Sequence, residues 1–206
     1  MSIPKNISHW YDGWIYAKFI AWHQRYIFDI AVDVMGMSGN VLDVACGTGE
    51  FAVQKAKFCD RIVGIDLSKR NIGKARETAR EMKLDNVEFI HGDAYKMKDH
   101  INEKFDYAII SFAIHEMPRS IREDVIRQML DAADKVIIAD YASPQPINFR
   151  GAFNYLVEFF AGIQHFRNFR DYQSHTGIRG LVKKIGAKVR RREELKSNST
   201  TIIEIE

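Results

Sequence analysis

Hydrophobic residues along the chain form short apolar runs that alternate with longer amphipathic segments. Such runs, typical of buried strands, occupy residues 41–46, 61–66, 87–90, 105–112 and 135–141. Between them, apolar positions recur every third or fourth residue, which is the spacing of a helix that buries one face. Strands that alternate with helices are typical of a parallel sheet covered by helices on both faces. The pattern predicts a doubly wound α/β core.

Two further segments have helical periodicity but carry two apolar stripes each. In residues 9–36 and in residues 147–172, both sides of the predicted helix are apolar or aromatic. One stripe can face the core, and the other needs an apolar substrate, a partner chain or a membrane surface to cover it. Membrane adsorption favours a strongly basic polar face, which residues 147–172 have only mildly, so a substrate-pocket wall is the favoured interpretation. The stripes of the second segment are Phe149, Phe153, Leu156, Phe160 and Ile163, and Tyr155, Phe159, Gly162, Phe166 and Phe169.

Near the middle and the end of the chain, local signals predict further boundaries. Ser120 and Glu123 have the spacing of a capping box at the start of a helix. A helix is expected over 174–185, followed by strands near 186–190 and 200–205. The basic run between 183 and 192 is followed at once by two acids, which favours a solvated sheet edge over an RNA site.

Composition narrows the class of protein. A chain of 206 residues fits one domain, and 46% hydrophobic with 28% charged residues is ordinary for a soluble globular protein. The net charge of +3 is too small to argue for nucleic acid. Cys46 and Cys59 make neither a disulfide framework nor a metal-ligand cluster, so we expect no metal site and a reducing, cytoplasmic setting. The N-terminus lacks the apolar run of a signal peptide, and charged residues interrupt the richest apolar segment, 14–35, so we do not expect it to span a membrane.

A glycine loop follows the first predicted strand. Gly47 and Gly49 stand between that strand and a helical segment, and Asp66 ends the next strand about twenty residues later. This layout is typical of a nucleotide site, because glycines let the backbone approach a ligand and an acid can hold ribose hydroxyls. Residues 47–52 also fit the G-x-G-x-x-A form of an NAD site, so an NAD-dependent oxidoreductase is an alternative.

The acid Asp43 inside the strand, followed by Cys46-Gly47-Thr48-Gly49, resembles motif I of the class I S-adenosylmethionine (SAM) dependent methyltransferases. The sequence His91-Gly92-Asp93-Ala94 after the third strand is similar to the motif that binds adenine in that superfamily. The resemblance implies SAM as cofactor and S-adenosylhomocysteine (SAH) as product. It also implies a seven-stranded, Rossmann-like, mostly parallel sheet with an antiparallel C-terminal edge pair.

The resemblance further implies an organisation of the chain as one methyltransferase domain over 1–206. Within it we expect an N-terminal helical lid (1–38), a SAM-binding core (39–142), a helical insertion that caps the substrate (143–172), and a C-terminal helix with edge strands (173–206).

The site residues follow from this organisation. The segment 111–116 would lie beside the transferable methyl group, and strand five ends with an acid and a phenol at the same sheet edge. His115 is a candidate general base or hydrogen-bond partner of the substrate, and Tyr141 is a second catalytic candidate. The candidate cofactor-binding residues are Asp43, Ala45, Gly47, Gly49, Asp66, Leu67, Gly92, Asp93, Ala94, Ser111 and Phe112, and the candidate substrate-binding residues are Tyr11, Trp14, His115, Tyr155 and Phe159.

Within the superfamily the chain is distantly similar to the ubiquinone and menaquinone C-methyltransferases. Those enzymes carry an Arg-Asn pair after strand four and a Lys-Pro-Gly-Gly turn before strand five, where this chain has His115-Glu116-Met117-Pro118 and Asp131-Ala132-Ala133-Asp134. We therefore expect a small apolar or aromatic acceptor without assigning a quinone. A methyltransferase-fold binding protein that docks a partner through residues 149–169 is another alternative, and a homodimer is compatible with the same aromatic helix.

Overall fold

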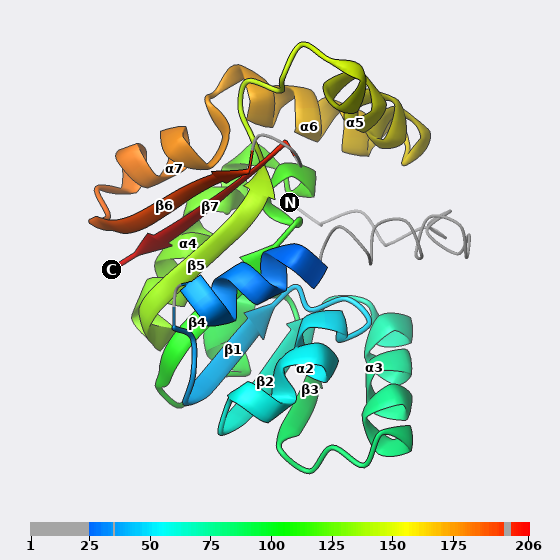
Figure 1. The fold of residues 1–206 in the computed structure, drawn as a ribbon, viewed down its shortest axis with the longest axis vertical. Helices are drawn as coiled ribbons and strands as arrows, with labels where there is room; N and C mark the ends of the chain where they lie inside the picture. Colours follow the sequence, from blue (N-terminus) through cyan, green and yellow to red (C-terminus); the bar gives the residue numbers. More distant parts are fainter. Residues whose placement is uncertain (1–24, 35, 196–198) are drawn as a thin grey trace.

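The computed structural model describes residues 25–34, 36–195 and 199–206. They form a seven-stranded sheet in the order β3-β2-β1-β4-β5-β7-β6 (Figure 1). Neighbouring strands among β1 to β5 pair in parallel, and β7 pairs antiparallel with both β5 and β6. This arrangement confirms the predicted fold class. The strands are β1 Asn40–Val44, β2 Arg61–Asp66, β3 Val87–His91, β4 Phe105–Ser111, β5 Ala133–Tyr141, β6 Val189–Leu195 and β7 Thr200–Ile205.

Helices cover both faces of the sheet, and each face has its own hydrophobic core. Alternate residues of β1 point to opposite faces: Val41 joins one core with Phe51 and Ile72, whereas Leu42 joins the other with Val125. Residues 25–29 are also helical. The other helical elements are η2 Ile30–Val34, α2 Glu50–Lys55, η3 Ala56–Phe58, α3 Lys69–Glu81, η4 Ala94–Asp99, η5 Ile114–Glu116, α4 Arg119–Ala132, α5 Phe149–Phe160, α6 Ile163–Ser174 and α7 Gly177–Ile185.

Several predicted boundaries were wrong for identifiable local reasons. The segment 147–172 is two helices, because the chain breaks at Gly162, whose φ of 126° is incompatible with a continuous helix. The predicted capping box is also wrong: α4 starts at Arg119, its N-cap is Pro118, and no side chain caps it. At the start of α5, the side chain of Asn148 accepts hydrogen bonds from the backbone N–H groups of Arg150 and Gly151.

The antiparallel pair β6–β7 confirms the expected edge, although β6 is longer than predicted and extends to Leu195. Its side chains are largely exposed, and Lys188 and Arg190 form ion pairs with Glu206. The basic run is therefore a solvated, ion-paired edge.

The predicted N-terminal helix over 9–36 is described only in part. Residues 25–34 are helical, and the helix does not include Gly36. The remainder of that prediction lies outside the described residues. In the described ranges, no helix combines the length and apolarity needed to cross a bilayer.

Figure 1 places α5 and α6 beyond the carboxyl end of β5, on the side of the molecule toward which the parallel strands point. This is the edge at which open parallel sheets bind ligands.

Candidate functional site

The switch point of the sheet lies between β1 and β4, where the chain crosses from one half of the sheet to the other. Immediately after these two strands, Ala45 and Phe112 have φ angles of 56° and 50°. Residues other than glycine rarely occupy this left-handed region, and such strain clusters at ligand sites. The prediction of a strand through residue 46 was wrong because Ala45 turns the chain here.

The two glycines of the loop are constrained in different ways. A Cβ atom placed on Gly47 would have no heavy atom within 4 Å, so this residue borders open space. A Cβ atom on Gly49 would lie 2.6 Å from the ring of Phe89, so this residue is needed for packing. Both have positive φ angles, of 56° and 76°. Gly47 therefore faces a place where a ligand can approach the backbone.

Asp66 holds the glycine loop from the neighbouring strand. One of its carboxylate oxygens accepts a hydrogen bond from Gly47 N–H at 2.9 Å, and the other accepts one from Ser68 N–H at 2.7 Å. Burial raises the pKa of this carboxyl group despite those two bonds, which act to lower the pKa. Each oxygen keeps acceptor capacity for a ligand hydroxyl.

Asp43 lies behind the loop on β1 and is almost completely buried. Its Oδ2 atom has no hydrogen-bond partner within the described chain. Burial, and then the charge of Asp66, raise its pKa well above the ordinary value of 3.8. Two carboxyl groups beside an open glycine loop suit a positively charged or hydroxyl-rich ligand.

The predicted third motif lies at the same sheet edge. Asp66 and His91 are register partners on β2 and β3, and Gly92 N–H donates to the carbonyl oxygen of Asp66 at 3.0 Å. The carboxylate of Asp93 accepts a hydrogen bond from Tyr95 N–H at 2.9 Å and caps η4. Leu67, next to Asp66, is half exposed. Ala94 follows Asp93 at the start of η4, and Ser111 ends β4 beside the switch point.

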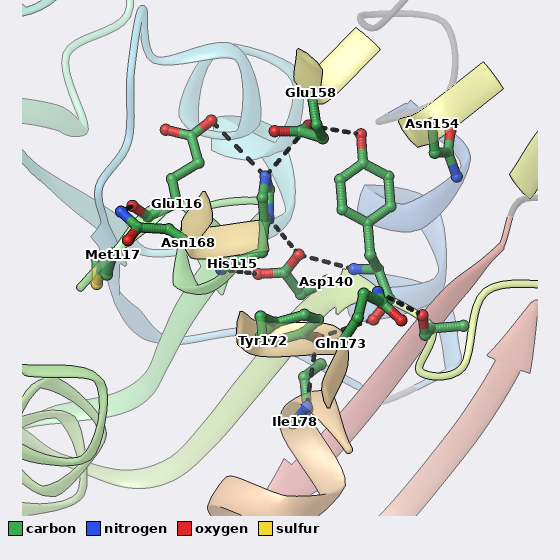
Figure 2. Close-up of polar contacts among 12 residues, drawn as sticks. His115, Glu116, Met117, Asp140, Asn154, Glu158, Asn168, Tyr172, Gln173 and Ile178 are labelled. Atoms are coloured by element: carbon green, nitrogen blue, oxygen red, sulfur yellow. Dashed lines mark hydrogen bonds and ion pairs between the residues drawn. The ribbon is translucent and has the colours of Figure 1, made fainter. Parts of the chain in front are cut away.

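His115 is the centre of a buried polar cluster (Figure 2). Its Nδ1 atom lies 2.5 Å from Asp140 Oδ1, and its backbone N–H donates to Asp140 Oδ2 at 3.0 Å. Its Nε2 atom lies 3.5 Å from Glu158 Oε1 and 3.8 Å from Glu116 Oε1, which are ion-pair distances without a hydrogen bond. The hydroxyl of Tyr141 donates to Glu158 Oε1 at 3.1 Å. The cluster thus joins η5, β5 and α5.

The charges of this cluster decide its protonation. Burial lowers the pKa of His115, but the charges of Asp140 and Glu158 raise it further, so its pKa lies well above 6.5. Burial acts to raise the pKa of Glu158, but His115 and the Tyr141 hydroxyl outweigh it, so this pKa is lowered. An imidazolium between two carboxylates is suited to donate a hydrogen bond, and the predicted role as a neutral general base requires a proton to leave first.

Aromatic rings surround the cluster. Tyr141 contacts Phe112 and Phe169 edge-on, with ring centroids 5.6 and 5.3 Å apart. Tyr155 packs on Phe169 at 5.0 Å and is 38% exposed, whereas Phe159 is 54% exposed. The second predicted stripe therefore packs α5 against α6 and continues to the surface. The predicted substrate residues Tyr11 and Trp14 lie outside the described residues.

Three buried polar residues that hold this cluster or its neighbouring elements together were not predicted as site residues: Asp140, Glu158 and Arg122. Glu158 is the one acid within the aromatic segment 149–169, a signal that could have marked it as buried and paired. In the sequence, Asp140 is recognisable only as an acid at the end of a predicted strand. Arg122 is fully buried on α4, and only the folded chain shows that it binds Asp171 and the carbonyl oxygens of Met117 and Asn168.

Comparisons with known proteins agree with this geometry. Residues 41–135 match a family described as a methyltransferase domain. This part of the chain, a little under half of it, is therefore similar to a methyltransferase domain.

Two curated relatives are demethylmenaquinone methyltransferases. The protein of Oceanobacillus iheyensis is 24% identical over 147 residues, covering 69% of this chain and 61% of the relative. The protein of Listeria monocytogenes is 31% identical over 121 residues, covering 56% of this chain and 50% of the relative. The matched part of this chain thus spans between half and two thirds of the length of those two relatives.

Solved structures show the same fold. The magnesium protoporphyrin IX methyltransferase of Synechocystis with bound SAH superposes with a TM-score of 0.64 at 17% identity, covering 94% of this chain and 87% of that one. An O-methyltransferase family protein from Burkholderia thailandensis has a TM-score of 0.70 at 14% identity, covering 92% and 57%. At these identities the likeness concerns the fold of the methyltransferase domain.

Proposed function

We propose that the protein is a SAM-dependent methyltransferase that acts on a small apolar or aromatic acceptor. The observation that carries this proposal is the open space at Gly47, which borders the switch point and is held by the carboxylate of Asp66. The strained residues Ala45 and Phe112 flank the same point. The match to a methyltransferase domain over residues 41–135 supports the reaction class.

The residues at this edge fit SAM. When bound, SAM supplies an electrophilic methyl group on a positively charged sulfur. The loop around Gly47 and Gly49 would admit its methionine part, and Asp66 would accept hydrogen bonds from its ribose. Asp93 and Ala94 would face its adenine, and Ser111 and Phe112 would border the methyl group. The buried Oδ2 atom of Asp43, which has no hydrogen-bond partner within the described residues, leaves a polar atom at this edge for a ligand to contact.

The acceptor would lie on the side of β4 and β5, where rings and the His115 cluster meet. Phe112 and Tyr141 are in edge contact there, which suits a flat apolar or aromatic compound. Relatives are demethylmenaquinone methyltransferases and one structural neighbour is a magnesium protoporphyrin IX methyltransferase, which supports a ring-bearing acceptor. Because the segments at 115–118 and 131–134 depart from the quinone-methylating pattern, the proposal stays at the level of this chemical class.

His115, Tyr141 and Glu158 would orient the acceptor. Methyl transfer is an in-line displacement in which positioning supplies much of the rate, and a base is needed only if the nucleophile must lose a proton. Glu158 is ionised, but its lowered pKa makes it a weak base, so we assign it to orientation, and protonated His115 is suited to donate a hydrogen bond.

Calorimetric titration tests the cofactor. We expect SAH to bind in the micromolar range and NAD to give no heat. Asp66→Ala should abolish SAH binding because the ribose acceptor and the hydrogen bond to the glycine loop are both lost. Asp85→Ala, at an exposed position in the turn before β3, is the matched control and should bind as the native chain does.

Two outcomes of this titration would contradict the proposed cofactor. Absence of heat with SAH, in a chain whose circular dichroism shows the native fold, would overturn the proposal. Binding of NAD alone would assign the glycine loop to an oxidoreductase.

A further inference from the structure

The outer side of α5 carries a row of solvent-exposed apolar side chains. Phe149, Leu156, Phe160 and Ile163 are 83%, 51%, 61% and 69% exposed, and Phe153 between them is 38% exposed. Their spacing of three or four residues puts the α5 members on one side of the helix, and Ile163 continues the row into α6. We call these five residues the α5 apolar face. This stripe is the first of the two predicted for residues 147–172, and the other described residues leave it largely uncovered.

The opposite side of α5 is firmly attached, which fixes the direction in which the apolar face points. Glu158 is buried against His115 and Tyr141. Asn154 donates a hydrogen bond to Gln145 at 2.8 Å, and Gly151 is packed so closely on Pro146 that a Cβ atom would collide with its backbone. The face is therefore presented to the surroundings by a helix held in one orientation.

The charges beside this face all have the same sign. The exposed charged side chains of α5 and α6 are Arg150, Arg167 and Arg170. Of the two acids of these helices, Glu158 is buried, and Asp171, which is 33% exposed, is paired with the buried Arg122 at 2.8 Å. An apolar face next to Arg167 and Arg170, on helices whose acids are buried or ion-paired, is complementary to an apolar phase bounded by anions.

This complementarity decides between two occupants. In a two-fold dimer through the α5 apolar face, the same patch of both copies would meet and arginines would lie near arginines, which is unfavourable. An anionic bilayer accepts apolar side chains below its headgroups and pairs arginines with phosphates. We propose that the α5 apolar face is a docking surface for an anionic phospholipid bilayer.

Docking there would place the carboxyl edge of the sheet next to the lipid, since α5 and α6 lie beyond that edge (Figure 1). The inference concerns surface binding and does not depend on methyl transfer.

Vesicle flotation of the full chain tests the proposal. We expect binding to vesicles of equal parts phosphatidylcholine and phosphatidylglycerol, and at least tenfold weaker binding to phosphatidylcholine alone. The double variant Leu156→Gln/Phe160→Gln should bind anionic vesicles at least tenfold more weakly, because two inserted apolar side chains are lost. The variant Arg167→Gln/Arg170→Gln should bind anionic vesicles about fivefold more weakly for each arginine removed. Its binding should also depend much less on salt concentration than that of the native chain.

A matched control lies on α3, where Arg80 is exposed and Met82 next to the helix end is 53% exposed. Arg80→Gln/Met82→Gln removes comparable charge and apolar surface elsewhere and should bind vesicles as the native chain does. If this control variant lost as much vesicle binding as the α5 variant, the binding would not be specific to the α5 apolar face and the proposal would be overturned.

Two further results would overturn the proposal. One is the absence of vesicle binding by the native chain. The other is a dimer in sedimentation that Leu156→Gln/Phe160→Gln dissociates, which would make a second copy the occupant. Titration of the same variants with SAH separates this outcome from the cofactor proposal, because vesicle binding and SAH binding are read independently.

Discussion

Gly47 and Gly49 show how one residue type meets two requirements within three positions. At Gly49 the limit is packing, because the Phe89 ring occupies the space of a side chain. At Gly47 no protein atom occupies that space, so the constraint is the left-handed backbone and the ligand that the loop would admit. The spacing of the motif is visible in the sequence, but this division of roles is visible only in the fold.

The buried cluster around His115 is the second feature at the residue scale. Its imidazolium compensates two carboxylates that are themselves almost completely buried. Removal of the positive charge would leave two like charges in a medium of low dielectric constant, which is costly. The cluster therefore links protonation to stability.

We predict that His115→Gln lowers the free energy of unfolding by about 3 kcal/mol near pH 6.5, and that this difference shrinks as the pH rises. The folded-state pKa of His115 lies above its ordinary value of 6.5, so its contribution is full below that pH and is lost as the pH rises through the raised pKa. Glu158 affects stability at acidic pH. Because its folded-state pKa is lowered, its contribution to the free energy of unfolding is lost as the pH falls below 4.5 through that pKa.

Urea unfolding between pH 6 and 9 measures this difference, with His175→Gln as control, since His175 is 44% exposed. The control should follow the native curve. A native-minus-variant difference that stays constant or grows with pH would contradict the assigned protonation.

At the scale of elements, a few buried polar residues hold the helices around the site. Arg122 on α4 donates to the carbonyl oxygens of Met117 and Asn168 at 3.0 and 2.7 Å and to Asp171 at 2.8 Å. It thereby connects the end of η5, which positions His115, with α6. Burial lowers the pKa of this guanidinium, although the charge of Asp171 opposes that change.

We predict that Arg122→Met destabilises the fold by about 2–4 kcal/mol, because two carbonyl groups and a carboxylate lose their partner. Arg127→Met, at an exposed position of the same helix, should stay within about 0.5 kcal/mol of the native chain. Chemical unfolding at neutral pH compares the three proteins. Equal stabilities for both variants would show that the hydrogen bonds of the buried Arg122 between α4 and α6 do not stabilise the fold.

At the scale of the whole molecule, stability is distributed unevenly. The central strands β4 and β5 are buried over most of their length and pair with neighbours on both sides. In α5, by contrast, only Gly151 and Glu158 are buried. Elements with few buried contacts open at lower free energy than the core does.

We therefore predict that amides of Phe149–Phe160 exchange with solvent at least about 100-fold faster than those of β4 and β5. Hydrogen exchange followed by mass spectrometry on the unliganded chain gives this comparison directly. Anionic vesicles should slow exchange in α5 and α6 but not in the central strands if the docking surface is as proposed. Equal protection of α5 and the central strands would instead make α5 part of the global unfolding unit.

The sequence by itself determined the sheet, the glycine loop and the edge at which the site lies. These features depend on local pattern: apolar runs set the strands, alternation with helices sets parallel pairing, and the two glycines with Asp66 mark the loop. The antiparallel end strands were expected from the resemblance of these motifs to a known superfamily, and the structure confirms them. Boundaries were wrong where a single backbone angle decided them, as at Ala45 and Gly162.

Tertiary structure alone decided which polar groups meet and which apolar groups remain outside. Glu158, His115 and Asp140 come from three elements, and no local pattern encodes their contact. The two stripes of 147–172 are alike in sequence, yet one packs on α6 and the other faces outward, because a helix buries only the side that neighbours reach. Periodicity identifies an amphipathic face, and only the packing of distant segments determines what covers it.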